Sequence, residues 1–275
     1  MGLKRFIYFG LFYEFMSFSK ICKNIKDLKI QGAQNVAIAG LKAISLKNDK
    51  KSVKKVLGLR ETEPLLKNSI KFVMKDFDRN YKIAMDHLKS SREKIAEIGY
   101  KKFKGKKVFT HCHSSTVVEI LKKAKVKRVF NTETRPLYQG RKTAKDLKEA
   151  KVEHYVDSGG KIALGRSDIM LIGCDGLCKK YVVNKIGSSM FVDIAKNLKK
   201  KVYVCGDSWK ICNEIKIEER DGSEIWKNNL KNVTVKNIAF DKIDNGLVDG
   251  IISELGIYNP KKFMMEVRKK YPEIF

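Results

Sequence analysis

Hydrophobic residues in the first third of the chain recur at three- to four-residue intervals, the spacing of amphipathic helices. Residues 47–55 are polar and are expected to form a connection. Gly99 and the basic run that follows it end the pattern. The spacing therefore predicts a helical domain over residues 16–105. Its amphipathic stretches are residues 17–30, 36–44, 57–74 and 81–98.

From Lys107 onward the pattern changes to short β-branched runs that alternate with helical stretches. Continuous apolar runs separated by helices are typical of a parallel sheet covered on both faces. The pattern predicts a doubly wound α/β domain over residues 106–275, and the length of the chain fits two domains. The predicted strands are residues 108–110, 126–130, 154–156, 169–172, 202–204 and 248–252.

Polar and reactive residues follow five of these predicted strands directly. Ligands of doubly wound sheets bind outside the carboxyl ends of the strands. We therefore expect the ligand site at this edge of the sheet. The segments concerned are residues 110–116, 131–136, 157–160, 173–176 and 206–210.

Cys112 lies between the first strand and a helix predicted over residues 117–124. The positive end of a helix dipole lowers a thiol pKa, so this position favours an accessible thiolate, and free backbone N–H groups there suit an anion. A small buried cysteine at a tight turn is the alternative. A metal site at His111-Cys112-His113 is not favoured, because adjacent side chains diverge and no second pair stands at zinc spacing.

Two further segments carry candidate groups. Asp175 follows the fourth strand, where a carboxyl group with a raised pKa is able to donate a proton; an N-cap or an Asx turn is the alternative. Asn184 and Lys185 precede a helix that is expected to run to Leu198, an arrangement that suits a phosphate. The alternative is that Lys185 is an ordinary surface lysine and that a serine caps the helix.

Arginine is scarce, with 10 of the 58 basic residues, so Arg60 and Arg135 are notable. A guanidinium binds phosphate with two parallel hydrogen bonds, which lysine cannot do, although a structural salt bridge is the alternative at both positions. Glu133 is expected to position Arg135, and Gln139 to turn the chain into a helix that begins near Thr143.

The net charge of +27 invites a nucleic-acid partner. The excess is lysine spread along the whole chain, which favours a solvated basic surface and makes a nucleic-acid partner the weaker interpretation. The six cysteines form no C-x-x-C pair, and we expect mostly buried thiols in a reducing cytoplasm.

Residues 6–18 are apolar and aromatic but too short to span a membrane. Three interpretations stay open: a start at Met16 with residues 1–15 an artefact, a docking helix, and a signal-peptide start. The chain lacks a G-x-G-x-x-G turn after a strand, a Walker loop and an H-E-x-x-H helix. These absences argue against nicotinamide enzymes, nucleoside triphosphatases and zinc proteases, and we expect no cofactor and no metal.

Seven segments together resemble the family that contains ribose-1,5-bisphosphate isomerase, methylthioribose-1-phosphate isomerase and the regulatory subunits of initiation factor 2B. The resemblance covers the chain from about Ile25 and is closest to the archaeal ribose-bisphosphate branch. The segments are Gln31-Gly32-Ala33, Arg60-x-Thr62 with Asn68, Thr110-His111-Cys112-His113-Ser114, Glu133-Thr134-Arg135-Pro136-x-x-Gln139-Gly140, Gly173-Cys174-Asp175, Asn184-Lys185-Ile186-Gly187 and Asn237-x-Ala239-Phe240-Asp241.

The resemblance implies a helical domain followed by a Rossmann-like domain, with Cys112 and Asp175 as the catalytic pair of an isomerase. Gln31 stands where the family's isomerases usually have arginine, and Glu61 where they have proline. Substrate binding is implied for Gln31, Gly32, Arg60, Arg135, Gln139, Asn184, Lys185 and Lys210.

The implied reaction converts ribose 1,5-bisphosphate to ribulose 1,5-bisphosphate in nucleoside degradation, without metal or redox cofactor, in a homo-oligomeric dimer or hexamer. Asp175 protonates the ring oxygen, and hydrogen then moves from C2 to C1, either as a proton through the Cys112 thiolate or as a hydride. Two alternatives remain: methylthioribose 1-phosphate as the substrate, and a non-catalytic subunit that binds initiation factor 2.

Overall fold

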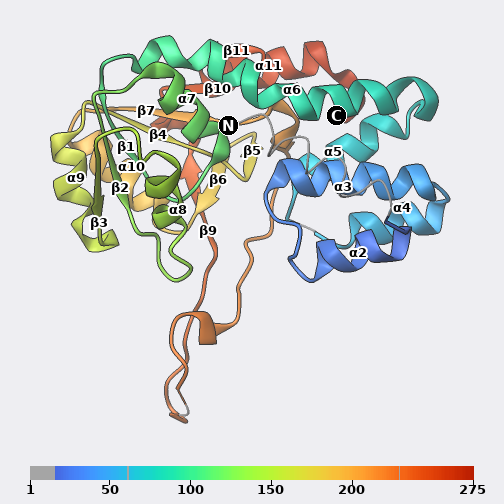
Figure 1. Ribbon diagram of the computed structural model, residues 1–275, viewed down its shortest axis with the longest axis horizontal. Helices are drawn as coiled ribbons and strands as arrows, with labels where there is room; N and C mark the ends of the chain where they lie inside the picture. Colours follow the sequence, from blue (N-terminus) through green and yellow to red (C-terminus); the bar gives the residue numbers. More distant parts are fainter. Residues whose placement is uncertain (1–15, 61, 229) are drawn as a thin grey trace. The chain divides into compact units, whose positions relative to one another are not determined.

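The structure is a computed structural model that describes residues 16–60, 62–228 and 230–275. Residues 1–15, on which the three interpretations of the first segment depend, lie outside the described residues. The chain forms two compact units, one of residues up to Ser90 together with Tyr271–Phe275, the other of Ser91–Lys270. The predicted border at 105/106 instead falls at the end of one long helix, α6, that passes from the first unit into the second (Figure 1).

The first unit is helical. Helix α3 packs against its neighbours α2, α4 and α5 through buried residues such as Leu41 and Ile44. The predicted connection at 47–55 is wrong in part, because Asp49 accepts hydrogen bonds from the N–H groups of Lys51 and Ser52 and so starts α4. The helices are α2 (Phe18–Lys26), α3 (Ala33–Leu46), α4 (Lys50–Leu57), α5 (Pro64–Val73), the start of α6 (Phe77–Phe103) and η5 (Pro272–Ile274).

The second unit contains a seven-stranded sheet in the order β11-β10-β7-β4-β1-β2-β3. All neighbouring strands are parallel except β10 and β11. The chain builds outward from β1 to β3 and then returns to β4, so the strand order reverses between β1 and β4. The strands are β1 (Lys107–Thr110), β2 (Arg128–Thr132), β3 (Val152–Tyr155), β4 (Ile169–Ile172), β7 (Lys201–Cys205), β10 (Gly250–Ser253) and β11 (Gly256–Tyr258).

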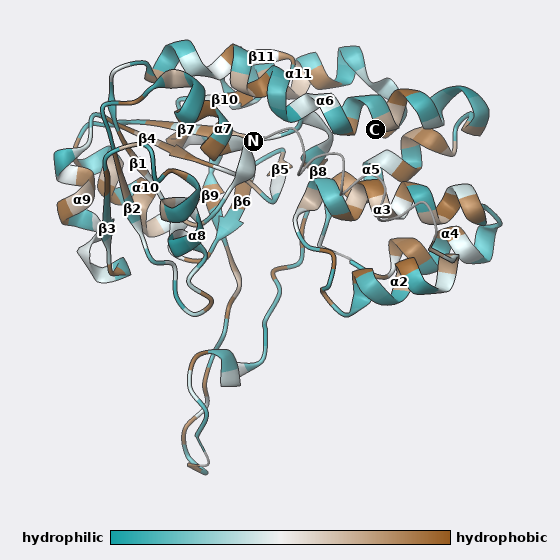
Figure 2. Cartoon of the chain, in the orientation of Figure 1, coloured by the Kyte–Doolittle hydropathy of each residue, from teal (hydrophilic) through white to brown (hydrophobic). Residues whose placement is uncertain are grey.

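Helices cover both faces of this sheet, as predicted for a doubly wound domain (Figure 1). On one face Phe103 and Ile120 pack against strand residues such as Leu171 in a single apolar cluster. Figure 2 shows hydrophobic residues concentrated in the strands between the helical layers. The helices are α7 (Ser115–Ala124), α8 (Gln139–Asp146), α9 (Gly160–Arg166), α10 (Ser188–Asn197) and α11 (Pro260–Lys270), with short turns η1 (Asp157–Gly159), η2 (Ser208–Lys210), η3 (Gly222–Glu224) and η4 (Asn245–Leu247).

A second sheet of four strands, in the order β8-β5-β6-β9, is inserted after β4 and was not predicted. Its strands are β5 (Gly176–Cys178), β6 (Tyr181–Lys185), β8 (Ile211–Cys212) and β9 (Phe240–Asp244). A disulfide between Cys178 and Cys212 joins β5 to β8. We expected mostly buried thiols, which is what Cys22, Cys174 and Cys205 are, while Cys112 is a free and half-buried thiol; the disulfide was not expected.

Residues 213–239, which we call the arm, connect β8 to β9 and extend away from the sheets (Figure 1). The two sides of the arm are joined near its base, where the N–H of Arg220 donates to the carbonyl of Asn237 over 2.8 Å. Further out, Trp226 is 51% and Leu230 57% exposed. The arm therefore presents apolar side chains to solvent.

Candidate functional site

Cys112 follows β1 with a left-handed backbone, at φ 68°. This conformation is disfavoured for a residue with a side chain. Two threonines hold it: the Cys112 N–H donates to Thr134 Oγ1 over 3.0 Å, and the Cys112 carbonyl accepts from Thr143 Oγ1 over 2.8 Å. A strained conformation that its neighbours enforce is a feature of functional sites, and it marks Cys112 independently of its sequence motif.

Asp175 follows β4, the strand that pairs with β1 at the reversal point of the sheet. The loops after these two strands touch, since a Cβ placed on Gly173 would lie 2.6 Å from Ser114 Cβ. The backbone N–H of Asp175 donates to the carbonyl of Val183 over 2.8 Å, which ties Asp175 to β6. The structure thus brings the predicted thiol and carboxyl group to one edge.

Cys112 is half-buried, and desolvation of its thiol raises its pKa to about 12. The Lys185 ammonium acts in the opposite direction, while the Asp175 carboxylate adds to the rise in pKa. The expected lowering of this pKa by the helix dipole is therefore wrong. Ser114 is the N-cap of α7, so Cys112 lies two residues before the cap. At that position desolvation of the thiol outweighs the effect of the dipole. The 2.9 Å contact between His111 and the Ile186 carbonyl brings the chain neighbours of these two residues, Cys112 and Lys185, to the same edge.

Asn184 and Lys185 end β6, and α10 begins only at Ser188. Both residues are buried. The Asn184 amide donates to Ser188 Oγ over 2.9 Å, and the Lys185 ammonium lies 5.0 Å from the centre of the Phe240 ring. Lys185 is thus a cation enclosed by protein beside Cys112, and the surface-lysine alternative does not hold.

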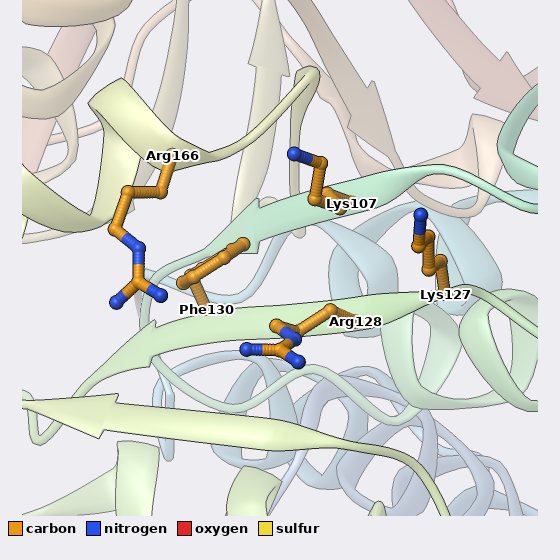
Figure 3. A pocket seen from close by; sticks show the side chains of 5 residues that line it. All are labelled: Lys107, Lys127, Arg128, Phe130 and Arg166. Carbon is orange, nitrogen blue, oxygen red and sulfur yellow. The ribbon is translucent and has the colours of Figure 1, made fainter.

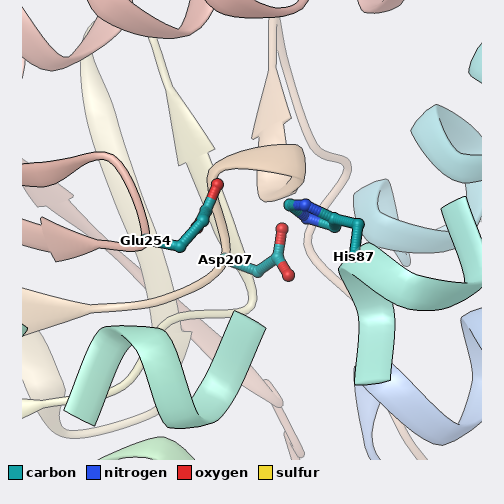
Figure 4. Close-up of side chains that lie close together, drawn as sticks. All are labelled: His87, Asp207 and Glu254. Atoms are coloured by element: carbon teal, nitrogen blue, oxygen red, sulfur yellow. The ribbon is translucent and has the colours of Figure 1, made fainter. Parts of the chain in front are cut away.

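Lys210 lies in η2, after β7. Its ammonium donates to the Cys174 carbonyl over 2.6 Å, directly beside Asp175. Figure 4 shows two acidic residues of this unit near η2: Asp207 accepts from the N–H of Trp209 over 2.9 Å, and Glu254 accepts from the N–H of Ser208 over 3.1 Å. The bond to Glu254, which follows β10, therefore holds the turn that carries Lys210 next to the end of that strand.

The loop after β2 carries Arg135, whose N–H donates to Asp157 over 2.7 Å. The Arg135 guanidinium is exposed, where it contacts Tyr138 and donates to the carbonyl of Ile225 in the arm over 3.3 Å. Glu133 does not position it, because the Glu133 carboxylate pairs with Arg141 at 3.2 Å instead.

Gln139 is the first residue of α8, four residues before the predicted helix start. Its side-chain oxygen is buried and accepts no hydrogen bond from the residues that the structure describes. A buried amide oxygen without a donor is uncommon, which marks Gln139 as a group able to receive a ligand hydroxyl.

Gln31, Gly32 and Arg60 belong to the helical unit. Gln31 is exposed, and Gly32 starts α3 with φ 85°, a conformation that glycine adopts readily. Arg60 donates to Glu63 over 3.0 Å through Nη2, whereas its buried Nη1 makes no hydrogen bond within the described part of the chain.

Three residues that shape the site were not singled out from the sequence. His111 contacts Thr132 Oγ1 at 2.6 Å and the Ile186 carbonyl at 2.9 Å, so it joins the ends of β1, β2 and β6. Burial lowers the pKa of His111. Thr134 and Asp157 fix the loops around Cys112. All three lie in segments that the sequence marked, at residues 110–116, 131–136 and 157–160, but their hydrogen bonds depend on the folded loops, which a sequence does not display.

The reversed strand order, with a thiol and a carboxyl group at the point of reversal, defines a Rossmann-like α/β protein with a candidate site at its switch point. The profile of the Initiation factor 2 subunit family matches residues 42–260. The chain belongs to this family, as its motifs indicated.

Relatives within the family carry two kinds of name. The chain is 30% identical over 292 residues to ribose 1,5-bisphosphate isomerase of Pyrococcus furiosus, covering 88% of this chain and 90% of the relative. It is 28% identical over 272 residues to a putative translation initiation factor eIF-2B subunit 2-like protein of the same organism, covering 90% and 98%. The crystal structure of translation initiation factor eIF-2B from Pyrococcus horikoshii OT3 matches with a TM-score of 0.77 at 25% identity, covering 89% and 98%.

Proposed function

We propose that the chain is an aldose–ketose isomerase that converts ribose 1,5-bisphosphate to ribulose 1,5-bisphosphate. The observation that carries the proposal is the meeting of Cys112 and Asp175 at the ends of neighbouring strands, with Lys185 and Lys210 beside them. Relatives named as this isomerase share 26–30% identity over most of the chain and support the assignment. A regulator has no need for a thiol and a carboxyl group together at this edge.

The chemistry explains why a proton donor such as Asp175 is required. Phosphorylation of the anomeric oxygen prevents ring opening to a free aldehyde, so the ring oxygen must be protonated. We assign this proton to Asp175. The ring C1–O bond then breaks, C1 becomes cationic, and the ring oxygen becomes the C4 hydroxyl. Hydrogen transfer from C2 to C1 and loss of the C2 hydroxyl proton to Asp175 complete the isomerisation.

The state of Cys112 favours one of the two transfer routes. With a pKa of about 12, the thiol is neutral at pH 7, and only about one part in 10⁵ is thiolate. A base so rarely ionised is a poor resting acceptor for the C2 proton. We therefore propose that hydrogen moves directly as a hydride, while the neutral Cys112 thiol covers C1 and C2 and excludes water.

Turnover in D₂O tests this route. A hydride shift retains the original hydrogen, so ribulose 1,5-bisphosphate formed in D₂O is expected to carry no deuterium at C1. Mass spectrometry and proton NMR of the product measure this. Deuterium at C1 in proportion to turnover would overturn the hydride route in favour of a proton carried by Cys112, without affecting the isomerase assignment.

We propose that cationic and amide side chains bind the phosphates and hydroxyls of the substrate. The Lys185 ammonium acts on the Cys112 thiol, and the Lys210 ammonium donates to the carbonyl of Cys174, the residue before Asp175. Arg135 has to leave the Ile225 carbonyl to bind a phosphate, and Arg60 has one nitrogen available in addition to its bond with Glu63. The proposed binding residues are Gln31, Gly32, Arg60, Arg135, Gln139, Asn184, Lys185 and Lys210.

The deciding experiment is an assay of the purified chain with ribose 1,5-bisphosphate and methylthioribose 1-phosphate. We expect turnover of ribose 1,5-bisphosphate, because its two phosphates require two groups of cations. Methylthioribose 1-phosphate carries an uncharged thioether in place of the second phosphate. Cys112→Ser and Asp175→Asn are expected to remove activity while the circular dichroism spectrum is retained. A wild-type chain that turns over neither sugar but captures initiation factor 2 at physiological salt would favour the regulatory-subunit alternative.

We further propose a cytoplasmic homo-oligomer. No described helix has the length and apolar character to cross a membrane. The exposed Trp226 and Leu230 of the arm are the apolar groups that a second copy would cover.

A further inference from the structure

A cavity of about 300 Å³ lies at the opposite edge of the main sheet from Cys112. It is formed where β1 and β2 begin, whereas the candidate site lies where the strands end. Figure 3 shows the five side chains around it, four of them cationic. They are Lys107, Lys127, Arg128, Phe130 and Arg166.

The two guanidinium groups are held in place by one carboxylate. Glu153 on β3 accepts hydrogen bonds from both Arg128 and Arg166. The Arg166 guanidinium also lies 5.4 Å from the centre of the buried Phe130 ring. Both arginines are therefore oriented before any ligand arrives, which lowers the entropic cost of binding.

The lysines are anchored through their backbones and leave their ammonium groups available. The Lys107 N–H donates to the Asp168 carboxylate over 2.8 Å, and the Lys127 N–H donates to the Lys106 carbonyl over 2.9 Å. Neither ammonium forms an ion pair with any described residue. Four cations thus face two carboxylates, Glu153 and Asp168, and an excess of positive charge remains.

We propose that this cavity binds a compact phosphate dianion, such as a small phosphate monoester, at a second site distinct from the candidate catalytic edge. Guanidinium groups supply directional hydrogen bonds to phosphate oxygens, and ammonium groups supply charge. The volume suits a small molecule. The small volume of the cavity favours a compact ligand over a nucleic-acid backbone, which requires an extended track of cations.

Calorimetric titration with inorganic phosphate tests the proposal. The Lys185→Gln variant serves as the background, because it weakens phosphate binding at the candidate catalytic edge. Adding Lys107→Gln and Lys127→Gln is expected to weaken the remaining binding about tenfold or more. The matched control is Lys179→Gln with Lys180→Gln, which removes the same charge from the exposed β5–β6 turn. It is expected to change binding less than twofold.

Equal phosphate affinity with and without Lys107 and Lys127 would overturn the proposal, and so would an equal loss of affinity in the control. A twelve-nucleotide single-stranded RNA that binds through Lys107 and Lys127, unaffected by competing phosphate, would also overturn it and indicate a nucleic-acid surface. Lys107→Arg with Lys127→Arg, which keeps the charge, should retain binding and exclude a folding defect. Because no turnover is measured, a failure of the isomerase assignment leaves this result intact.

Discussion

The ammonium group of Lys210 donates a hydrogen bond to the carbonyl oxygen of Cys174, the residue before Asp175. A side chain that follows β7 thereby fixes the backbone that carries the proposed acid after β4. Lys210 has two tasks in the proposed site, since it supplies positive charge and also positions Asp175.

Replacing Lys210 by methionine should separate these tasks. The change removes the donor to a buried carbonyl, at a cost of about 1–3 kcal/mol, and loosens Asp175. We expect kcat/KM for ribose 1,5-bisphosphate to fall about 100-fold, with a clear loss in kcat as well as a higher KM. Steady-state kinetics measure this, with Lys179→Met as control. A rise in KM alone would mean that Lys210 only binds phosphate.

The raised pKa of Cys112 can be read from its reactivity. Because the folded-state pKa is about 12, the thiolate fraction should rise tenfold with each pH unit between pH 7 and pH 10. Alkylation of the Cys112 peptide by iodoacetamide, followed by mass spectrometry, is expected to show this slope without a plateau. A plateau below pH 9 would indicate an activated thiolate and restore the proton route.

The disulfide between Cys178 and Cys212 closes a loop with a sequence separation of 34. Restricting the unfolded chain in this way is worth about 3–4 kcal/mol. We expect the Cys178→Ser/Cys212→Ser variant to lose about this much unfolding free energy and to become insensitive to reductant in thermal melts. Cys22→Ser is the control that keeps the bond. Identical melting of the wild type with and without dithiothreitol would contradict the prediction.

His113 should make the protein sensitive to mild acid. Burial lowers its pKa to about 4, and nearby Lys142 contributes to the shift. The unfolded chain takes up a proton near pH 6.5 that the folded chain resists, so stability present above pH 6.5 is lost as the pH falls toward 4, by up to about 3 kcal/mol. Urea unfolding at several pH values measures this slope.

The His113→Asn variant should show a shallower loss of stability between pH 6.5 and pH 4 than the wild type. The exposed His154 offers the matched change, and His154→Asn is expected to keep the wild-type slope. Parallel slopes for wild type and His113→Asn would show that other groups govern the response to acid.

The arm should govern self-association. Trp226→Asp with Leu230→Asp places two charges where an apolar contact is proposed, and we expect a lower molar mass by light scattering after size exclusion. Lys231→Asp, nearby and already polar, is the control. A wild-type chain that is monomeric at micromolar concentration, or a double variant of unchanged mass, would refute a role of the arm in assembly.

The fold of the main sheet followed from the sequence because its strands are short, apolar and regularly separated by helices. Residues 176–185 gave no comparable signal. No helix separates β5 from β6, and β6 pairs with β9, more than fifty residues further along the chain. The disulfide was missed for the same reason, since the pairing of β5 with β8 is what brings Cys178 to Cys212.

The site residues of the sheet unit were predictable as a set, because the carboxyl ends of parallel strands meet at one edge. Their protonation and contacts were not. The Cys112 pKa depends on how completely the folded chain excludes water from the thiol, and the partner of Arg135 is a carbonyl ninety residues away. Local sequence carries neither quantity.

The antiparallel pairing of β5 with β6 gives the turn at Lys179 and Lys180 an unexpected importance. Successive side chains of a strand point to opposite faces. A slip of β6 by one residue against β5 and β9 would therefore turn Lys185 to the opposite face and withdraw its ammonium from the thiol. The length of this short turn, together with the pairing of β6 to β9, thus holds the register on which the cation of the site depends.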